Sequence, residues 1–272
     1  MRAKVFKSQS QLGQHAARHV DALASRLRDA RFDFLFRPGP WLPDVNGVPD
    51  ADLDLFLQTW LGSPEAVVIL DLSGLPSSIL DDMIGALLRI LYDALFWGRH
   101  LPEGARSRPL LIVLEEAHTY LQSDTHGPAK DAVQRIVKEG RKYGVGAMIV
   151  SQRPAEIDPT ILSQCGTTIA MRLSNPSDRS HVASAVSDHM TGLLETLPAL
   201  KTGEAIILGE AVPLPMRAII DLPPPDRRSV SVDAIVCGSD GTTGWGRPRQ
   251  SEDYAKIVRA WRARKPQSDR DA

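Results

Sequence analysis

Three short apolar runs constrain the fold more than any other feature of this chain. Residues 66–72 read AVVILDL, residues 109–114 read PLLIVL and residues 147–150 read AMIV. Continuous aliphatic runs of this length are typical of strands that are buried on both faces of a parallel sheet. Helix-length segments separate them along the chain. The order strand, helix, strand, helix, strand therefore predicts an α/β fold with a mostly parallel sheet flanked by helices.

Further helices and strands are expected around these runs. Apolar residues at steps of three and four predict helices over residues 12–31, 51–61 and 129–143. Ser77 or Ser78 can cap another helix, which ends before Gly98. The remaining expected elements are a strand over 167–173, short helices over 177–187 and 189–194, and a closing pair of strands over 205–208 and 216–220.

The composition predicts three segments. Residues 1–61 form a helical segment that precedes the core, and residues 62–224 form the core itself. Prolines, glycines and serines predominate from residue 223 to residue 250, which is typical of a segment without its own core. Residues 225–272 are therefore expected to form an extended C-terminal arm that ends in an amphipathic helix near residues 252–264.

Charge, cysteine content and hydropathy indicate the cellular compartment of the protein rather than its activity. The formal net charge is -1, so no overall basic field indicates DNA binding, although a ring can confine basic residues to its channel. Two cysteines give no disulfide framework, and the first 20 residues contain no apolar stretch typical of a signal peptide. The apolar segment 79–97 carries Asp81, Asp82, Arg89 and Asp93, which favours a buried helix over a membrane span. We expect a cytoplasmic protein without a membrane partner.

Two carboxylates follow the second apolar run directly, in the sequence LLIVLEEAH. Ligands bind at the carboxyl edge of parallel sheets, so Glu115 and Glu116 are expected at a binding edge. One carboxylate there can hold Mg²⁺ through water, and the next can orient or deprotonate an attacking water. A strand end that merely begins an acidic helix is the alternative.

An amide follows the third apolar run in the same way, in the sequence AMIVSQRP. Gln152 can hydrogen-bond a terminal phosphate or the attacking water, or it can simply satisfy backbone groups of its own loop. Arg141 follows Gly140 near the end of the preceding helix. A cation there compensates the helix dipole, but in a ring it can also face the phosphates of a neighbouring subunit.

Together, these segments resemble the C-terminal part of the HerA-type ATPases, a branch of the P-loop DNA motors. The matching segments are LLIVLEEAH, EGRKYGVGAMIVSQRP, ILSQCGTTIAMRLSNPSDR, TGEAIILGEA and PLPMR, and the similarity runs from about residue 32 to residue 225. The resemblance implies a RecA-like fold, a hexameric ring, ATP and Mg²⁺ as cofactors, translocation on DNA, and a nuclease or other effector as a partner.

The resemblance also implies roles for individual residues. Glu115 is the metal-side residue of a Walker B pair and Glu116 the catalytic glutamate. Gln152 is the sensor, and Arg141 is the finger that acts on a neighbouring subunit. Arg172 is a further basic contact to an ATP phosphate or a neighbour, and Arg179 a weaker one.

One part of the family pattern is missing from these residues. A phosphate-binding loop reads G-x-x-x-x-G-K-[ST], yet no Gly-Lys dipeptide occurs in the sequence. We therefore expect the chain to be inactive alone, as either a fragment or a subunit whose phosphate-binding half is elsewhere. A non-catalytic RecA-like subunit that supplies Arg141 to a partner is the alternative function.

Two weaker interpretations concern acidic and histidine side chains. A metal-dependent nuclease could use Asp71, Glu115 and Glu116. This sequence, however, lacks the carboxylate-x-lysine pattern that is common near the metal in such enzymes. His118 and His126 do not match the spacing of a zinc motif, so they are expected to be solvated loop residues.

Overall fold

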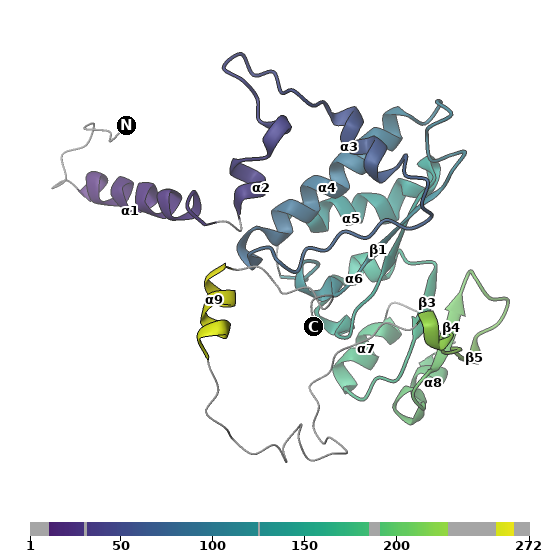
Figure 1. Ribbon diagram of the computed structural model, residues 1–272. Helices are drawn as coiled ribbons and strands as arrows, with labels where there is room; N and C mark the ends of the chain where they lie inside the picture. The colour runs from purple at the N-terminus through teal and green to yellow at the C-terminus, as the bar shows by residue number, and fades with distance from the viewer. Residues whose placement is uncertain (1–10, 30–31, 125, 185–190, 228–253, 264–272) are drawn as a thin grey trace. The chain divides into compact units, whose positions relative to one another are not determined.

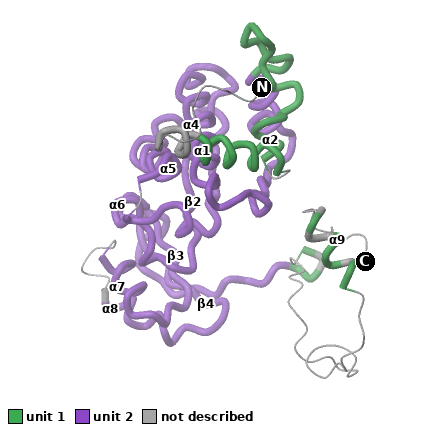
Figure 2. Tube along the Cα trace, turned by 90° about the vertical axis from the view of Figure 1, so that its left-hand side faces the viewer, with its two compact units in different colours: residues 1–52, 224–272 green, residues 53–223 purple. Residues whose placement is uncertain are grey.

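The computed structural model describes residues 11–29, 32–124, 126–184, 191–227 and 254–263. The chain divides into two compact units, which Figure 2 distinguishes by colour. Unit 1 combines Met1–Asp52 with Pro224–Ala272, and unit 2 is Leu53–Pro223. The candidate site residues all lie in unit 2.

Unit 1 contains helices only, within the residues described. Its elements are α1 (Gln11–Arg26), α2 (Asp33–Phe36), the 3-10 turn η2 (Gly39–Trp41), the turn η8 (Pro225–Arg227) and α9 (Ala255–Ala263). The helices expected within residues 12–31 and near residues 252–264 are thereby confirmed as α1 and α9.

Unit 2 contains two small sheets and their helices (Figure 1). The strands are β1 (Leu110–Leu114), β2 (Val145–Ile149), β3 (Thr167–Ala170), β4 (Glu204–Gly209) and β5 (Met216–Ile219). The α-helices are α3 (Leu53–Trp60), α4 (Ser77–Trp97), α5 (Pro128–Glu139), α6 (Pro159–Leu162), α7 (Pro176–Ser184) and α8 (Thr191–Leu194). Short 3-10 turns are η3 (Ala117–Thr119), η4 (Gly140–Tyr143), η5 (Pro154–Glu156) and η7 (Leu197–Ala199).

Helices α4 and α5 cover one face of a parallel pair, β1 and β2. Leu110 pairs with Val145 and Leu114 with Ile149, so the carboxyl ends of both strands lie at the same edge. Apolar residues of α4 and α5 pack with alternate residues of both strands in one core. The two helices approach closely at Gly85, where an added Cβ would lie 2.5 Å from the Pro128 carbonyl carbon. This core fixes the loops that follow β1 and β2.

The expected single sheet is wrong, because β3 belongs to a second sheet. β3 pairs antiparallel with β4, and β4 pairs antiparallel with β5. This sheet has its own core, in which Ala170, Ile206 and Leu208 pack with residues of α7, α8 and η7. The observed fold is therefore mixed α/β, with one small parallel sheet and one antiparallel sheet. The closing pair of strands is confirmed as β4 and β5.

The strand expected at residues 66–72 is also absent, although these residues are described. Val67 and Ile69 are 72% and 86% exposed, and this segment pairs with no described strand. A strand needs a neighbour that completes its backbone hydrogen bonds, and side-chain preference alone cannot supply one. Only Leu72, at the end of the run, packs against the core of α4 and α5.

The second face of the parallel pair is apolar and open in this chain. Leu111 is 61% exposed, Val113 49% and Met148 44%, and they alternate with the covered residues of the same strands. Parallel sheets in proteins are covered on both faces. The described part of the chain thus contains one covered and one uncovered face of this sheet.

None of the described helices is both long and apolar enough to span a membrane.

Candidate active site

The loops after β1 and β2 bring Glu116 and Gln152 into contact. The Gln152 side-chain nitrogen Nε2 donates a hydrogen bond to Glu116 Oε1 over 2.8 Å. Both side chains are exposed at the carboxyl edge of the parallel pair. An amide that donates to a carboxylate makes a charge-assisted hydrogen bond and fixes the orientation of both groups. The two residues expected at this edge therefore form one polar unit.

The backbone at Glu116 has an unusual conformation. With φ 47° and ψ 40°, it is left-handed, and no other described residue except glycine has a positive φ. Such a conformation costs on the order of 1–3 kcal/mol for a residue with a Cβ, and it is concentrated at functional sites. The neighbouring Ala117 N–H donates to Val150 O over 3.0 Å, which ties this turn to the end of β2.

His118 completes the contacts of Glu116. Its Nδ1 lies 3.4 Å from Glu116 Oε2 and 3.2 Å from Ser151 Oγ. The His118 side chain is only 14% exposed. The interpretation of His118 as a solvated loop histidine is therefore wrong. Sequence spacing could not show this contact, because the left-handed turn at Glu116 directs the following residues back toward the β2 loop.

Glu115 has a different environment from Glu116. Its carbonyl oxygen accepts from the buried Tyr120 hydroxyl over 3.0 Å. Burial, with a smaller contribution from the Glu115 carboxylate, raises the pKa of Tyr120 to about 12. The carboxylate of Glu115 is exposed and has no hydrogen bond or ion pair with any described residue. It is available to a ligand outside the chain.

Among these residues, the Glu115 carboxylate is the one that fits a Mg²⁺ ion. Mg²⁺ often keeps several waters and uses one or two carboxylates together with substrate phosphates. Glu115 offers one such carboxylate. Within the described ranges, no three His, Cys, Asp or Glu side chains gather to hold a metal. Asp71 therefore does not join Glu115 and Glu116, and the three-carboxylate arrangement considered for a nuclease is not formed.

A buried ion pair lies behind these two loops. Lys130 Nζ contacts Asp158 Oδ2 at 2.6 Å, and the side chains are 6% and 12% exposed. Burial raises the pKa of Asp158, but hydrogen bonds from Lys130 and Thr160 outweigh it, so the pKa is lowered overall. The sequence contained one signal of this pair. Lys130 lies in the first turn of α5, where the helix dipole disfavours a cation.

Arg141 lies at the opposite edge of the sheet. It belongs to η4, immediately before β2, whereas Gln152 follows β2. Its side chain is exposed and makes no hydrogen bond or ion pair with the described residues. The five residues of β2 span roughly 16 Å at about 3.3 Å each. The structure thus does not bring Arg141 together with Glu116 of the same chain.

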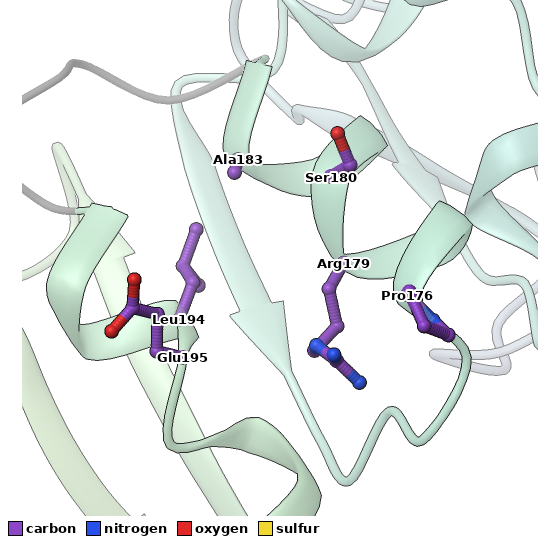
Figure 3. A pocket seen from close by; sticks show the side chains of 6 residues that line it. All are labelled: Pro176, Arg179, Ser180, Ala183, Leu194 and Glu195. Carbon is purple, nitrogen blue, oxygen red and sulfur yellow. The ribbon is translucent and has the colours of Figure 1, made fainter.

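Arg172 and Arg179 lie beyond β3, in the region of the antiparallel sheet. Arg172 follows the end of β3 and is exposed. Arg179 lines a pocket of about 210 Å³ together with Pro176, Ser180, Ala183, Leu194 and Glu195 (Figure 3). Its guanidinium also donates to Ser174 O over 2.7 Å, which supports the chain ahead of α7. Glu115, Glu116 and Gln152 do not line this pocket.

Comparison with known proteins identifies the family. Residues 47–227 match the family described as the C-terminal region of HerA-like helicases. This match covers well over half of the chain. The chain belongs to the HerA-like helicase C-terminal family.

Relatives within this HerA-like family are considerably longer than the part that matches. The DNA double-strand break repair helicase HerA of Sulfolobus acidocaldarius is 34% identical over 195 residues, which are 71% of this chain and 38% of that protein. The enzyme of the same name from Sulfurisphaera tokodaii is 37% identical over 155 residues, 57% of this chain and 31% of that protein. The HerA-like chain therefore spans well under half the length of these relatives.

Among solved structures, the genome packaging NTPase B204 of Sulfolobus turreted icosahedral virus 2, in complex with ATP-gammaS, is similar with a TM-score of 0.44. The two sequences are 15% identical, and the match covers 60% of this chain and 70% of that chain. A likeness of this size identifies no function.

Proposed function

We propose that this chain is the C-terminal part of an ATP-driven DNA translocase or helicase. ATP is hydrolysed at sites between neighbouring subunits of a ring, which we expect to be hexameric. DNA is the track of the motor, and a nuclease or other effector is an associated partner. Membership of the HerA-like helicase family supports this proposal. The observation that carries it is the contact between Glu116 and Gln152 at the carboxyl edge of β1 and β2.

In this proposal, Glu116 is the general base and Gln152 orients it. The Glu116 carboxylate accepts a proton from the attacking water, and the Gln152 amide holds that carboxylate in position. His118 restrains the second oxygen of Glu116 from the other side. Mg²⁺ bound here would neutralise charge on the phosphate oxygens. Glu115 is the residue that would hold it, through water.

The phosphates of ATP need contacts that these residues do not provide. The sequence has no Gly-Lys loop to surround them with backbone N–H groups. The open apolar face formed by Leu111, Val113 and Met148 is suited to cover by further α/β structure. We infer that further α/β structure from outside these 272 residues packs on this face and supplies the phosphate-binding loop at the carboxyl edge of the strands.

An alternative function also has an observation in its favour. Arg141 is exposed and free of partners among the described residues, at the edge away from Glu116. A subunit that only supplies Arg141 to a neighbour would show this arrangement without hydrolysing ATP itself. The two functions differ in whether Glu116 of this chain is needed.

The substitution Glu116→Gln tests the proposal in an ATP-hydrolysing assembly that contains this chain. The amide preserves the shape of the side chain but cannot accept the proton, so hydrolysis should be lost while ATP binding remains. Glu210→Gln, an exposed glutamate past β4, is the matched control and should leave hydrolysis unchanged. Full hydrolysis with Glu116→Gln would favour the assembly subunit.

A further inference from the structure

Three charged side chains are buried in the described part of the chain, and all three act on one loop. Lys130, Asp158 and Asp178 are 5%, 8% and 7% exposed. Asp158 belongs to the loop of residues 151–158, which we name the Gln152 loop. Lys130 pairs with Asp158, and Asp178 Oδ1 accepts from the backbone N–H of Ala155 over 3.0 Å. A buried charge is costly unless it is paired. Three buried charges at one loop therefore indicate that the position of this loop is important.

The ammonium group of Lys130 also binds the loop that carries Glu116. We name residues 115–124 the Glu116 loop. Lys130 Nζ donates to Gln122 O over 3.1 Å and to Ser123 O over 3.0 Å, in addition to its contact with Asp158. An ammonium has three donors, and here one group contacts acceptors on both loops.

The two loops are joined at two places, one near Glu116 and Gln152 and one far from them. At the far end, Asp158 N–H donates to Leu121 O over 2.9 Å, and Gln122 forms a β-bridge with Ile157. At the near end, Ala117 N–H donates to Val150 O, and Gln152 donates to Glu116. Lys130 and Asp158 are at the far end, and the candidate catalytic side chains are at the near end. The far contacts therefore join the same two loops that carry the near side chains.

We propose that Lys130 and Asp158 are positioning residues that hold the Gln152 loop against the Glu116 loop, so that the Gln152 amide stays on the Glu116 carboxylate. This inference rests on the proposed function, because the position matters for hydrolysis only if Glu116 is the base. Neither residue touches the reacting atoms. A displacement of about 1 Å in a catalytic constellation can lower the rate on the order of 10²-fold.

Two variants separate the effect of the Lys130–Asp158 pair on stability from its effect on the position of the loops. Lys130→Met removes the ammonium and leaves the buried Asp158 carboxylate without a counterion. This single variant should therefore be less stable than the double variant described next. The double variant Lys130→Met with Asp158→Asn removes both charges at nearly constant shape. The double variant no longer buries a charge without a counterion, so it should be more stable than Lys130→Met in urea unfolding. It should not recover the loop contacts.

Arg135→Met is the matched control. Arg135 lies on the same helix, α5, and pairs with Asp93 at 3.3 Å, but it has no described contact with either loop. The control also removes one cation, together with its ion pairs to Asp93 and Glu139. It should change stability without changing the two loops.

The measurements are hydrogen exchange in this chain and ATP hydrolysis in the assembly that contains it. In the double variant, the backbone amides of Ala117 and of position 158 should exchange faster than in the wild type, while the Ile207 amide of β4 should not change. The kcat should fall on the order of 10²-fold while KM for ATP is retained. Arg135→Met should show neither effect.

Two outcomes overturn the positioning role. One is wild-type exchange at Ala117 and at position 158 in the double variant. The other is a kcat that returns to the wild-type value together with stability. Undiminished hydrolysis by Glu116→Gln instead overturns the proposed function, and the exchange measurement then still decides whether the pair holds the loops together.

Discussion

Gln152 Nε2 lies 2.8 Å from Glu116 Oε1, across the carboxyl ends of two neighbouring parallel strands. The contact joins an amide and a carboxylate that are 36 residues apart in the sequence. Glu116 holds a left-handed backbone conformation at this point, which is unfavourable for a residue with a side chain. The local strain and the polar contact occur at the same residue, as expected where a side chain must have one orientation for chemistry.

Gln152→Ala should lower the rate of hydrolysis more than it lowers ATP affinity. The substitution removes the donor to Glu116 but no group that we expect to carry the binding energy of ATP. Loss of one preorganised donor costs roughly 10²–10³-fold in kcat in other enzymes. Steady-state kinetics of the ATP-hydrolysing assembly provide the measurement. Gln164→Ala, an exposed glutamine after α6, serves as the control and should behave as wild type. Equal loss of affinity and rate would indicate that Gln152 holds ATP instead.

The 272-residue chain alone should bind ATP weakly and hydrolyse little. It lacks the glycine-lysine loop that supplies most phosphate contacts in motors of this kind. Titration with a fluorescent ATP analogue and a phosphate-release assay would measure both properties. Micromolar affinity together with steady turnover by the purified chain would disprove this prediction.

The site edge could be predicted from sequence because it depends on local patterns. An apolar run locates a strand, and parallel strands place the residues that follow them at the same edge. The edge positions of Glu115, Glu116 and Gln152 follow from these patterns, and their roles stay predictions. The contact of His118 with Glu116 and Ser151 was missed, because it depends on one left-handed backbone at Glu116 that no periodic pattern indicates. Lys130 was missed because its acceptors lie on two separate loops, and Asp158 is far from it along the chain.

The sheet as a whole could not be predicted from the same patterns. Residues 66–72 have the side chains of a strand, but the described residues contain no neighbour that pairs with them. The sequence of β3 does not reveal that its partner is β4, some 40 residues later, instead of β2. Sheet membership is decided by contacts between segments that are far apart along the chain, and a window of ten residues does not contain that information.

Val113→Thr should leave the stability of the isolated chain nearly unchanged. Val113 lies on the open face of β1 and is 49% exposed, so its new hydroxyl group stays in contact with water. The change in free energy of unfolding should be within about 0.5 kcal/mol. Val145→Thr is the same substitution at a residue that is 2% exposed, and it should cost about 1–3 kcal/mol because its hydroxyl group is buried.

The same pair of variants tests whether the open face is covered in the motor. If further α/β structure packs on Val113, then Val113→Thr should weaken the complete assembly although it spares the isolated chain. Urea unfolding of the chain and the assembly state of the complete protein would be measured side by side. An assembly that is insensitive to Val113→Thr would contradict cover of this face.

The Lys130–Asp158 pair should make the chain sensitive to acid. Burial acts to raise the pKa of Asp158, but hydrogen bonds from Lys130 and Thr160 lower it below its value in the unfolded chain. The resulting stabilisation is complete above about pH 4, the pKa of an unfolded Asp, and is lost as pH falls through the folded pKa. Urea unfolding between pH 6 and the acid range, roughly pH 3, would measure it. Asp158→Asn should flatten the dependence, whereas Asp221→Asn, at an exposed site, should not.

Arg141 provides the test of hydrolysis between subunits. If Arg141 stabilises charge on the phosphates of a neighbour, its removal should lower hydrolysis by ~10³–10⁵-fold, the contribution of such arginines in other phosphoryl-transfer systems. If it only compensates the dipole of its own helix, removal costs about 0.3–1 kcal/mol of stability and leaves hydrolysis nearly intact. Lys142→Ala, at the adjacent exposed cation, is the control and should remain active.

The most direct measurement mixes Arg141→Ala subunits with Glu116→Gln subunits and records DNA-stimulated ATP hydrolysis. Each variant should assemble into rings and be inactive alone. A mixed ring contains interfaces where an intact Glu116 faces an intact Arg141 of the neighbouring subunit, so partial activity should return. The account predicts a maximum at intermediate mixing ratios. Near-normal hydrolysis by rings of Arg141→Ala alone, or no activity at any ratio, would contradict hydrolysis between subunits.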